Sequence, residues 1–369
     1  MKKYFVLLVS LLLLLTGCGK LTAGDAVGEF TKLVENSKSY KLSGTMEING
    51  DEEVFTYSLE TYFLKDDFYK VVLVNQTNNH EQVILKNTDG LYVVTPNLNK
   101  SFKFDSVWPE NSSQAYLLMN LVNDMKNDSE VALEETDSGY IIKSKVNYPN
   151  NEELTYQKVY FDKKMVPEKV EVFNGQDVAK IKVVFKTVDL KAKLKEEDFK
   201  LEDLIDEDVE NNENNDQNSN QNNNQNNECT DESTCKTDKC EGEDCKTDEK
   251  TNVSLDSIIY PLYIPANTHL SSSETVSTED GDRVILTFSG DKNFVLVEEV
   301  ARKSNEFEII PVFGDPFMIN ESIAAVSSNS MSWNARNISY YLVGSDLSTS
   351  EMVSIASSLG NSSTVISTK

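Results

Sequence analysis

Residues 82–95 read QVILKNTDGLYVVT, two short apolar runs joined by a polar turn. The runs are Gln82–Lys86 and Leu91–Thr95, and the turn between them is Asn87-Thr88-Asp89-Gly90. Aliphatic, β-branched and aromatic residues bounded by Asn, Asp and Gly predict a strand, a turn and a second strand. The segment therefore predicts an antiparallel hairpin and a fold built on a sheet.

Similar short runs on both sides of this hairpin extend the prediction over residues 22–200. Further strands are expected at Tyr40–Ile48, Val54–Leu64, Phe68–Val74, Ser129–Glu135, Tyr140–Lys145, Leu154–Phe161, Lys169–Phe173 and Ile181–Leu190. Their partial alternation is typical of an antiparallel sheet with one covered face. A sheet of about ten strands tends to curl, so we expect a curved sheet with a concave side.

Two helices are expected to cover that concave side. One lies near Asp25–Ser37 and the other near Ser112–Met125, where two serines are suited to capping. Their apolar stripes make a candidate face for an apolar ligand, formed by Val27, Phe30, Leu33, Val34, Tyr116, Leu117 and Leu121. The alternative is that these side chains simply fill the core.

The N-terminus reads as a secretion signal. Lys2 and Lys3 precede the apolar run Tyr4–Leu15, which is shorter than the roughly 20 residues that span a bilayer as a helix. The run ends in Leu15-Thr16-Gly17-Cys18, which resembles the bacterial lipobox. In that motif the cysteine receives a diacylglyceryl group and becomes the new N-terminus. We expect a signal peptide at 1–17, a lipidated N-terminus at 18–21, and no cofactor other than this covalent lipid. The alternative is an ordinary secretion signal with an incidental cysteine.

Residues 201–252 have the composition of a disordered linker. An Asn/Gln-rich run covers 211–227, and residues 202–250 hold 17 acidic and 4 basic residues, a net charge of -13. A segment with almost no apolar side chains cannot offset the entropy that ordering costs. We expect it to be extended by its own charge repulsion.

Four cysteines lie in this linker, at Cys229, Cys235, Cys240 and Cys245. Their spacings of six, five and five positions lack the paired Cys-x-x-Cys of structural zinc sites. Outside the cytoplasm, disulfides form readily, and four cysteines allow three pairings. Disulfides or free thiols are the first interpretation, and a metal site is the alternative.

Residues 253–369 are expected to form a small α+β domain. Candidate strands are Arg283–Phe288, Phe294–Val300, Phe307–Val312 and Ser339–Val343. Near the end, Ser348 and Glu351 have the spacing of a capping box, an apolar helix face follows, and Gly360 would end that helix.

Charge and residue inventory exclude two classes of function. A formal net charge of -26 repels nucleic acid and anionic headgroups. The chain has two histidines, His80 and His269, and lacks a Gly-x-Ser-x-Gly elbow, a phosphate-binding glycine loop and a His-Glu-x-x-His motif. We therefore predict a protein that is not an enzyme and does not bind DNA or RNA.

Several stretches resemble a known family. Residues 82–124, which continue as PNLNKSFKFDSVWPENSS (96–113) and QAYLLMNLVND (114–124), are similar to the sporulation lipoproteins of Gram-positive spore formers. Residues 283–299 and 331–359 look like the C-terminal domain of the same lipoproteins, a domain of unknown function. The wider group includes proteins similar to the lipoprotein carrier LolA and the stress sensor RseB. The resemblance implies a curved antiparallel half-barrel with helices on its concave face, which agrees with the strand and helix count. The linker departs from the family pattern.

These observations predict a mainly β, two-domain envelope lipoprotein on the outer face of the cytoplasmic membrane, exposed outside the cell or between the membranes of a forming spore. It would bind an acyl chain or a lipoprotein without catalysis, and its partners would be the membrane and that ligand. A protein held by a lipid cannot diffuse between membranes, so lipid handling would mean acceptance or sensing at one surface. The alternative is a scaffold or sensor with a filled core that binds an envelope protein in spore assembly or germination.

Overall fold

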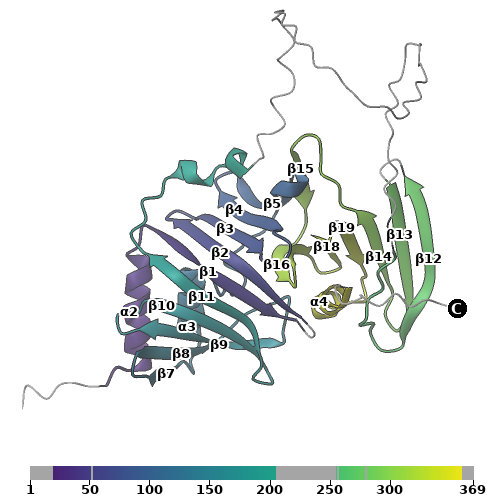
Figure 1. Cartoon of the computed structure of the whole chain (residues 1–369). Helices are drawn as coiled ribbons and strands as arrows, with labels where there is room; N and C mark the ends of the chain where they lie inside the picture. The colour runs from purple at the N-terminus through teal and green to yellow at the C-terminus, as the bar shows by residue number, and fades with distance from the viewer. Residues whose placement is uncertain (1–19, 51–52, 205–254, 256, 279–280, 360–369) are drawn as a thin grey trace, which may run out of the picture.

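The computed structural model describes residues 20–50, 53–204, 255, 257–278 and 281–359. These residues form two β-sheets and three α-helices, with short 3-10 helices between them (Figure 1). The predicted mainly β fold with helices is confirmed. Cys18 and residues 205–252 of the predicted linker lie outside the described residues, and the domain boundaries stay predictions.

The first sheet has twelve strands, and eleven of them come from the first half of the chain. These are β1 (Ser39–Asn49), β2 (Val54–Leu64), β3 (Phe68–Asn75), β4 (Glu81–Asn87), β5 (Gly90–Thr95), β6 (Lys100–Phe104), β7 (Ala132–Glu135), β8 (Gly139–Lys145), β9 (Leu154–Asp162), β10 (Pro167–Asn174) and β11 (Ala179–Asp189). The sheet order is β15-β6-β5-β4-β3-β2-β1-β11-β10-β9-β8-β7. All ten predicted strands are present. β6 was missed because KSFKF, with two lysines, has little strand signal of its own.

The twelfth strand comes from the second half of the chain. β15 (Glu308–Val312) pairs with β6 in parallel, with Glu308 opposite Lys100. The prediction of a purely antiparallel first sheet is therefore wrong at this edge, and the predicted strand Phe307–Val312 belongs to the first sheet. The Glu308 N–H donates to the Asn99 carbonyl at 3.1 Å. Backbone N–H groups alternate in direction along a strand, so the nitrogen of Pro311 points away from β6, toward the open edge of the sheet. Proline has no N–H there that another chain could use for pairing.

The second sheet has seven antiparallel strands. They are β12 (Thr268–Thr278), β13 (Gly281–Gly290), β14 (Phe294–Val300), β16 (Asp315–Ile319), β17 (Ser322–Val326), β18 (Ser330–Ala335) and β19 (Ile338–Val343). The order is β12-β13-β14-β19-β18-β17-β16. The last helix, α4 (Thr349–Ser358), begins with the predicted capping box, and Gly360 lies outside the described residues. β12, β16, β17 and β18 were not predicted from the sequence.

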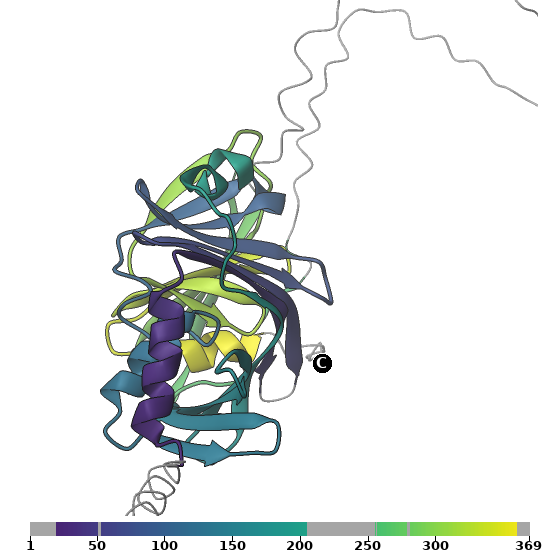
Figure 2. The same ribbon diagram turned by 90° about the vertical axis from the view of Figure 1, so that its left-hand side faces the viewer.

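Helices α2 (Ala23–Glu35) and α3 (Leu118–Asn127) pack on the first sheet (Figure 2). α2 begins at a capping box in which the Asp25 N–H donates to the Thr22 hydroxyl. α3 begins six residues later than predicted, after Leu117, without a side-chain cap. The prediction that Ser112 and Ser113 start this helix is wrong. Ser113 is used elsewhere, since its hydroxyl donates to Asp124 Oδ1 at 2.8 Å.

Three short 3-10 helices belong to the first half of the fold. The first follows β5 at Pro96–Leu98. The other two, Glu196–Phe199 and Glu202–Leu204, lie against a small apolar cluster on β3, β4 and β5 that Phe199 and Leu201 complete. This cluster is separate from the core under α2 and α3. The first sheet is therefore covered on its second face at β3, β4 and β5.

Strand β17 lies between two cores. It reads SIAAV and is buried at every position. Ile323 and Ala325 belong to the core of the first sheet, whereas Ala324 and Val326 belong to the core of the second. Because successive side chains of a strand point to opposite faces, one strand contributes to both cores.

Hydrogen bonds add to this connection between the halves. The Ile323 N–H donates to Gln82 Oε1 at 2.8 Å, and the Tyr57 hydroxyl donates to the Asn320 carbonyl. At the sheet edge the Ser304 N–H donates to the Leu98 carbonyl at 2.9 Å. Within the described residues the two halves thus share a sheet, a core strand and several polar contacts.

Candidate functional site

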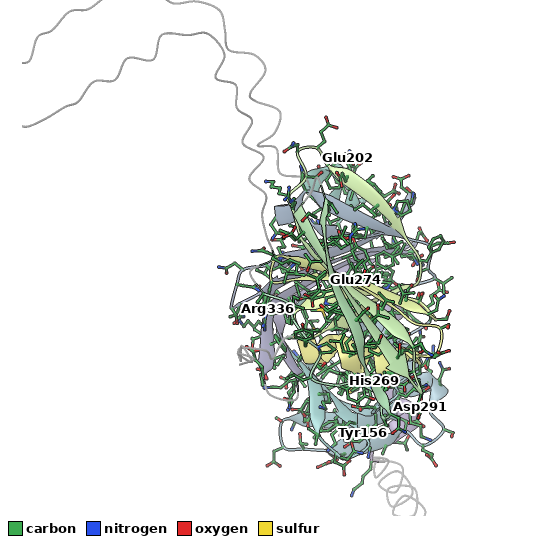
Figure 3. The ribbon with its side chains drawn as sticks, turned by 90° about the vertical axis from the view of Figure 1, so that its right-hand side faces the viewer. Tyr156, Glu202, His269, Glu274, Asp291 and Arg336 are labelled. Carbon is green, nitrogen blue, oxygen red and sulfur yellow. The ribbon has the colours of Figure 1, made fainter. Side chains whose placement is uncertain are left out.

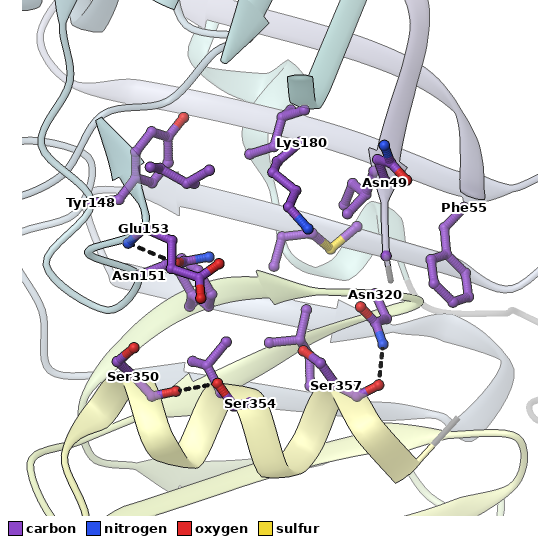
Figure 4. Close-up of a pocket in the computed structure, with 18 of the residues that line it drawn as sticks. Asn49, Phe55, Tyr148, Asn151, Glu153, Lys180, Asn320, Ser350, Ser354 and Ser357 are labelled. Carbon is purple, nitrogen blue, oxygen red and sulfur yellow. Dashed lines mark hydrogen bonds between the residues drawn. The ribbon is translucent and has the colours of Figure 1, made fainter. Parts of the chain in front are cut away.

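A cavity of about 480 Å³ lies between the first sheet and α4 (Figure 4). β1, β2 and β11 provide one wall, with Met46, Ile48, Phe55 and Ile181. A second wall is provided by Tyr148, in the turn between β8 and β9, and by Leu154 at the start of β9. The segment before α3 adds Gln114, Ala115 and Tyr116, and the second half of the chain adds residues 316–320, α4, and Leu262 and Tyr263. Both halves are needed to form this space.

Small side chains on α4 leave the cavity open. Ser350, Val353, Ser354 and Ser357 line it, and Figure 4 shows the three serines along the helix, facing Lys180 and Asn49. The Ser354 hydroxyl donates to the Ser350 carbonyl at 3.0 Å, so its proton is used within the helix. The wall is thus built mainly from short side chains.

A few polar groups stand among the apolar ones. Lys180 brings one positive side chain to the cavity, Glu53 and Glu153 bring two acidic ones, and Gln114 and Asn151 add amides. The Asn320 side-chain amide donates to the Ser357 carbonyl at 2.7 Å, which joins β16's end to α4. An apolar pocket with a few placed polar groups is the usual form of a small-molecule site.

A buried polar network supports the wall nearest α3. Asp124 accepts hydrogen bonds from the Ser113 hydroxyl at 2.8 Å and from Gln157 Nε2 at 3.0 Å. The Asn147 N–H in turn donates to the Ser113 hydroxyl at 2.8 Å. The cavity residues Gln114 and Tyr148 come directly after Ser113 and Asn147 in the chain. The network therefore fixes both loops of this wall.

Burial raises the pKa of Asp124 to about 7, against the two hydrogen bonds, which lower it. An unfolded aspartate titrates near 4, so between pH 4 and pH 7 the folded state binds the extra proton. The contribution of Asp124 to stability is thus present at low pH and is lost as the pH rises to 7.

The Asp124→Asn variant is expected to lose this part of the pH dependence. Urea unfolding measures the free energy of unfolding, which should fall between pH 5 and pH 8 in the wild type. In the variant this fall should be smaller by on the order of 2 kcal/mol. The same fall in both proteins would contradict the assignment.

The predicted ligand face lies mostly away from the cavity. Val27, Phe30, Val34, Tyr116, Leu117 and Leu121 are buried in the first core, and Leu33 is partly buried. Phe30, for example, packs edge-on against Phe161 with ring centroids 4.8 Å apart. Of the seven predicted residues, Tyr116 alone also lines the cavity. The role of the others as a ligand face stays a prediction.

Sequence reasoning missed the cavity because its walls come from distant segments. One signal was available: serines at 350, 354 and 357 recur at helical spacing on the last helix. A stripe of small residues on a helix indicates a close approach or a space. The stripe does not show, however, which strands and loops lie opposite this helix.

The other predicted sites are placed as follows. Cys18, Cys229, Cys235, Cys240 and Cys245 lie outside the described residues. His80 precedes β4, where its Nδ1 lies 3.2 Å from Asn97 Nδ2, and His269 lies on β12 of the other sheet, near Asp291 in Figure 3. Within the described ranges, no three His, Cys, Asp or Glu side chains group to hold a metal. No described helix is long and apolar enough to span a membrane.

Comparison with known proteins gives matches over nearly the whole chain. A family model described as "Sporulation protein YdcC-like" matches residues 1–199. The curated sporulation protein YdcC of Bacillus subtilis is 32% identical over 362 residues, which is 97% of each chain.

Two solved structures are also similar. The complex of Pseudomonas aeruginosa MucA and MucB matches with 12% identity, a TM-score of 0.31, and coverage of 90% of this chain and 97% of that one. A LolA superfamily protein of Nitrosomonas europaea matches with 10% identity and a TM-score of 0.29, over 49% of this chain and 98% of that one.

Proposed function

The chain belongs to the sporulation protein YdcC-like family, and on this premise we propose that it is a membrane-anchored, non-catalytic binding protein of the sporulating cell envelope. Its ligand is an apolar molecule such as an acyl chain, held in the cavity between the first sheet and α4. Family membership was the prediction from residues 82–124 and the C-terminal stretches, and it is confirmed. The ligand and the anchor are the proposal.

The cavity is the observation that carries this proposal. Its volume of about 480 Å³ falls within the ~300–1,000 Å³ of ligand pockets. Met46, Ile48, Phe55 and Phe317 offer apolar surface to a chain of methylene groups, each worth about 0.8 kcal/mol when buried. Lys180, Asn49 and Glu153 offer polar contacts to a head group. An amphiphile with one apolar tail fits this distribution.

The chemistry of the cavity favours binding over catalysis. Several serines line it, and a serine attacks only when a base takes its proton. The Ser354 proton goes to the Ser350 carbonyl and the Ser358 proton to the Ile355 carbonyl. Both hydroxyls are therefore engaged by their own helix.

The position of the predicted anchor limits how the ligand arrives. α2 begins at Ala23, five residues after Cys18, at the lower end of the molecule in Figures 1 and 2. A diacylglyceryl group on Cys18 would hold the fold close to the outer face of the cytoplasmic membrane. The ligand would then be received from that membrane or from a protein at its surface.

Filling the cavity is expected to abolish ligand binding. We would express the chain from Lys20 onward, which contains every described residue, without detergent, and measure bound lipid by native mass spectrometry. Ser354→Trp places a large ring in the cavity and should weaken binding of a fatty acid about tenfold or more. Glu29→Trp, on the exposed side of α2, is the matched control and should bind normally. Equal binding by both variants would refute the cavity as the site.

One surface supports the alternative, a scaffold that binds a protein partner. On the outer face of the second sheet, Ile285, Val297 and Tyr341 stand opposite one another on β13, β14 and β19. Tyr341 is 44% and the nearby Val343 is 50% exposed. An apolar row on an uncovered face is typical of an interaction surface. If the chain from Lys20 onward purifies without ligand, and Tyr341→Lys impairs sporulation but not thermal stability, this alternative is favoured.

A further inference from the structure

Residues 257–264 form a strap that crosses the second core and reaches the cavity. The strap reads SIIYPLYI. Ile258 and Ile259 at one end and Ile264 at the other pack against the second core. Between them, Leu262 and Tyr263 line the cavity yet are 61% and 41% exposed. The strap therefore has two anchored ends and an exposed tip that is part of the cavity wall.

One buried carboxyl group holds the first end of the strap. The Ile259 N–H donates to Glu298 Oε2 at 3.1 Å. Among the described residues this is the one hydrogen bond that joins residues 257–264 to the second sheet. Glu298 is fully buried on β14, and its other oxygen, Oε1, has no hydrogen-bond partner. A buried carboxyl group with one partner is costly when it is ionised.

Among the described residues, no charged side chain acts on the pKa of Glu298, whereas Arg336 and Glu321 act on that of its neighbour Tyr340. The neighbours of Glu298 in register are Val284 on β13 and Tyr340 on β19. Tyr340 is the titratable group that faces it there. Burial raises the pKa of Tyr340, so it faces Glu298 as a neutral phenol. The strap adds only Tyr260 and Tyr263, both exposed. Burial raises the pKa of Glu298 to about 7, against the bond from Ile259.

We infer that residues 260–263 are a movable cover on the cavity and that Glu298 is its latch. With a neutral Glu298 the Ile259 anchor is held and the cover stays closed. Ionisation strengthens the bond from Ile259 but leaves a buried anion with that single partner. The cost of burying the anion outweighs this one bond, so the anion gains by reaching water, the Ile259 anchor is released and the cover opens. Cover and latch together would regulate access to the cavity, and this role rests on the proposed function. The latch itself requires no ligand.

Hydrogen exchange tests the latch without any ligand. In the chain from Lys20 onward, exchange of the Ile259 amide, divided by its intrinsic rate, should rise about tenfold from pH 6 to pH 8, as the ionised fraction of such a group does. Glu298→Gln keeps the acceptor and the shape but cannot ionise, so its corrected rate should stay low at both pH values. Asp124→Asn, which alters the other carboxyl group with a pKa near 7, should behave as the wild type does.

Uptake of the uncharged probe N-phenyl-naphthylamine then connects the latch to the cavity. The wild type should take it up several-fold faster at pH 8 than at pH 6, and Glu298→Gln should be slow at both. A wild-type-like pH dependence of Ile259 exchange in Glu298→Gln would overturn the latch. Probe binding in no variant, with the exchange result as expected, would instead count against the proposed function and leave the latch standing.

Discussion

Replacing Ile323 by aspartate is expected to unfold both halves of the chain in a single step. Ile323 is 6% exposed, lies in the first core, and belongs to the strand whose other face lies in the second core. An unpaired carboxylate at this position costs several kcal/mol. Whole domains are stable by only about 5–15 kcal/mol. The loss of β17 should therefore remove both cores together.

The chain contains its own reporters for this experiment. Its two tryptophans are Trp108, fully buried in the first core, and Trp333, 5% exposed in the second. In Trp333→Phe the fluorescence reports the first half, and in Trp108→Phe it reports the second. We expect coincident urea transitions from the two proteins, because β15 and β17 join the halves.

The control for Ile323→Asp is Ser328→Asp, which places the same side chain in the exposed turn after β17. This variant should unfold at the wild-type urea concentration. If Ile323→Asp shifts the Trp108 signal but leaves the Trp333 signal unchanged, the halves are independent folding units and the shared-strand account is wrong.

Replacing Cys18 by serine is expected to remove the membrane anchor completely. Lipid transfer in the lipobox needs the sulfur nucleophile, and a hydroxyl group does not replace it. Two acyl chains hold a protein stably at a bilayer. In cells fed labelled palmitate, the wild type should carry label and remain in the membrane fraction after a salt wash. The serine variant should carry none and leave that fraction.

The matched control for this experiment is Cys229→Ser, which changes a cysteine of the linker and should keep both the label and the membrane location. Label on the Cys18→Ser variant would show that another residue is acylated. A membrane-bound variant without label would indicate retention by some other contact. Either result would overturn Cys18 as the anchor.

Local patterns in the sequence were sufficient for most of the first half of the fold. The alternating run Val54–Leu64 is a strand at those same limits, and the hairpin of residues 82–95 forms β4 and β5 as predicted. Ser348 and Glu351 mark the start of α4. Each of these features depends on residues within one turn or one strand, so periodicity and capping chemistry contain the whole signal. Family membership was likewise readable from short stretches.

Tertiary contacts overruled the local signal at particular residues. Ser113 looks like a helix cap, but Asp124 and Asn147 take its hydroxyl, and α3 starts at Leu118 instead. Residues 27–34 of α2 look like a ligand face; most of them lie in the first core, and their role as a ligand face stays a prediction. A local pattern shows that a side chain is apolar and which way it faces. It does not show whether protein or ligand fills the space opposite.

The sequence by itself determined the family, ten of the eleven first-half strands of the first sheet to within a few residues, and the start of the last helix. Only the tertiary structure decided that β15 pairs with β6, a strand about two hundred residues earlier, that β17 serves two cores, and that a cavity lies beside α4. The physical reason is that pairing and packing between distant segments depend on which surfaces meet. That choice depends on the free energy of the whole chain, and no single stretch of residues contains it.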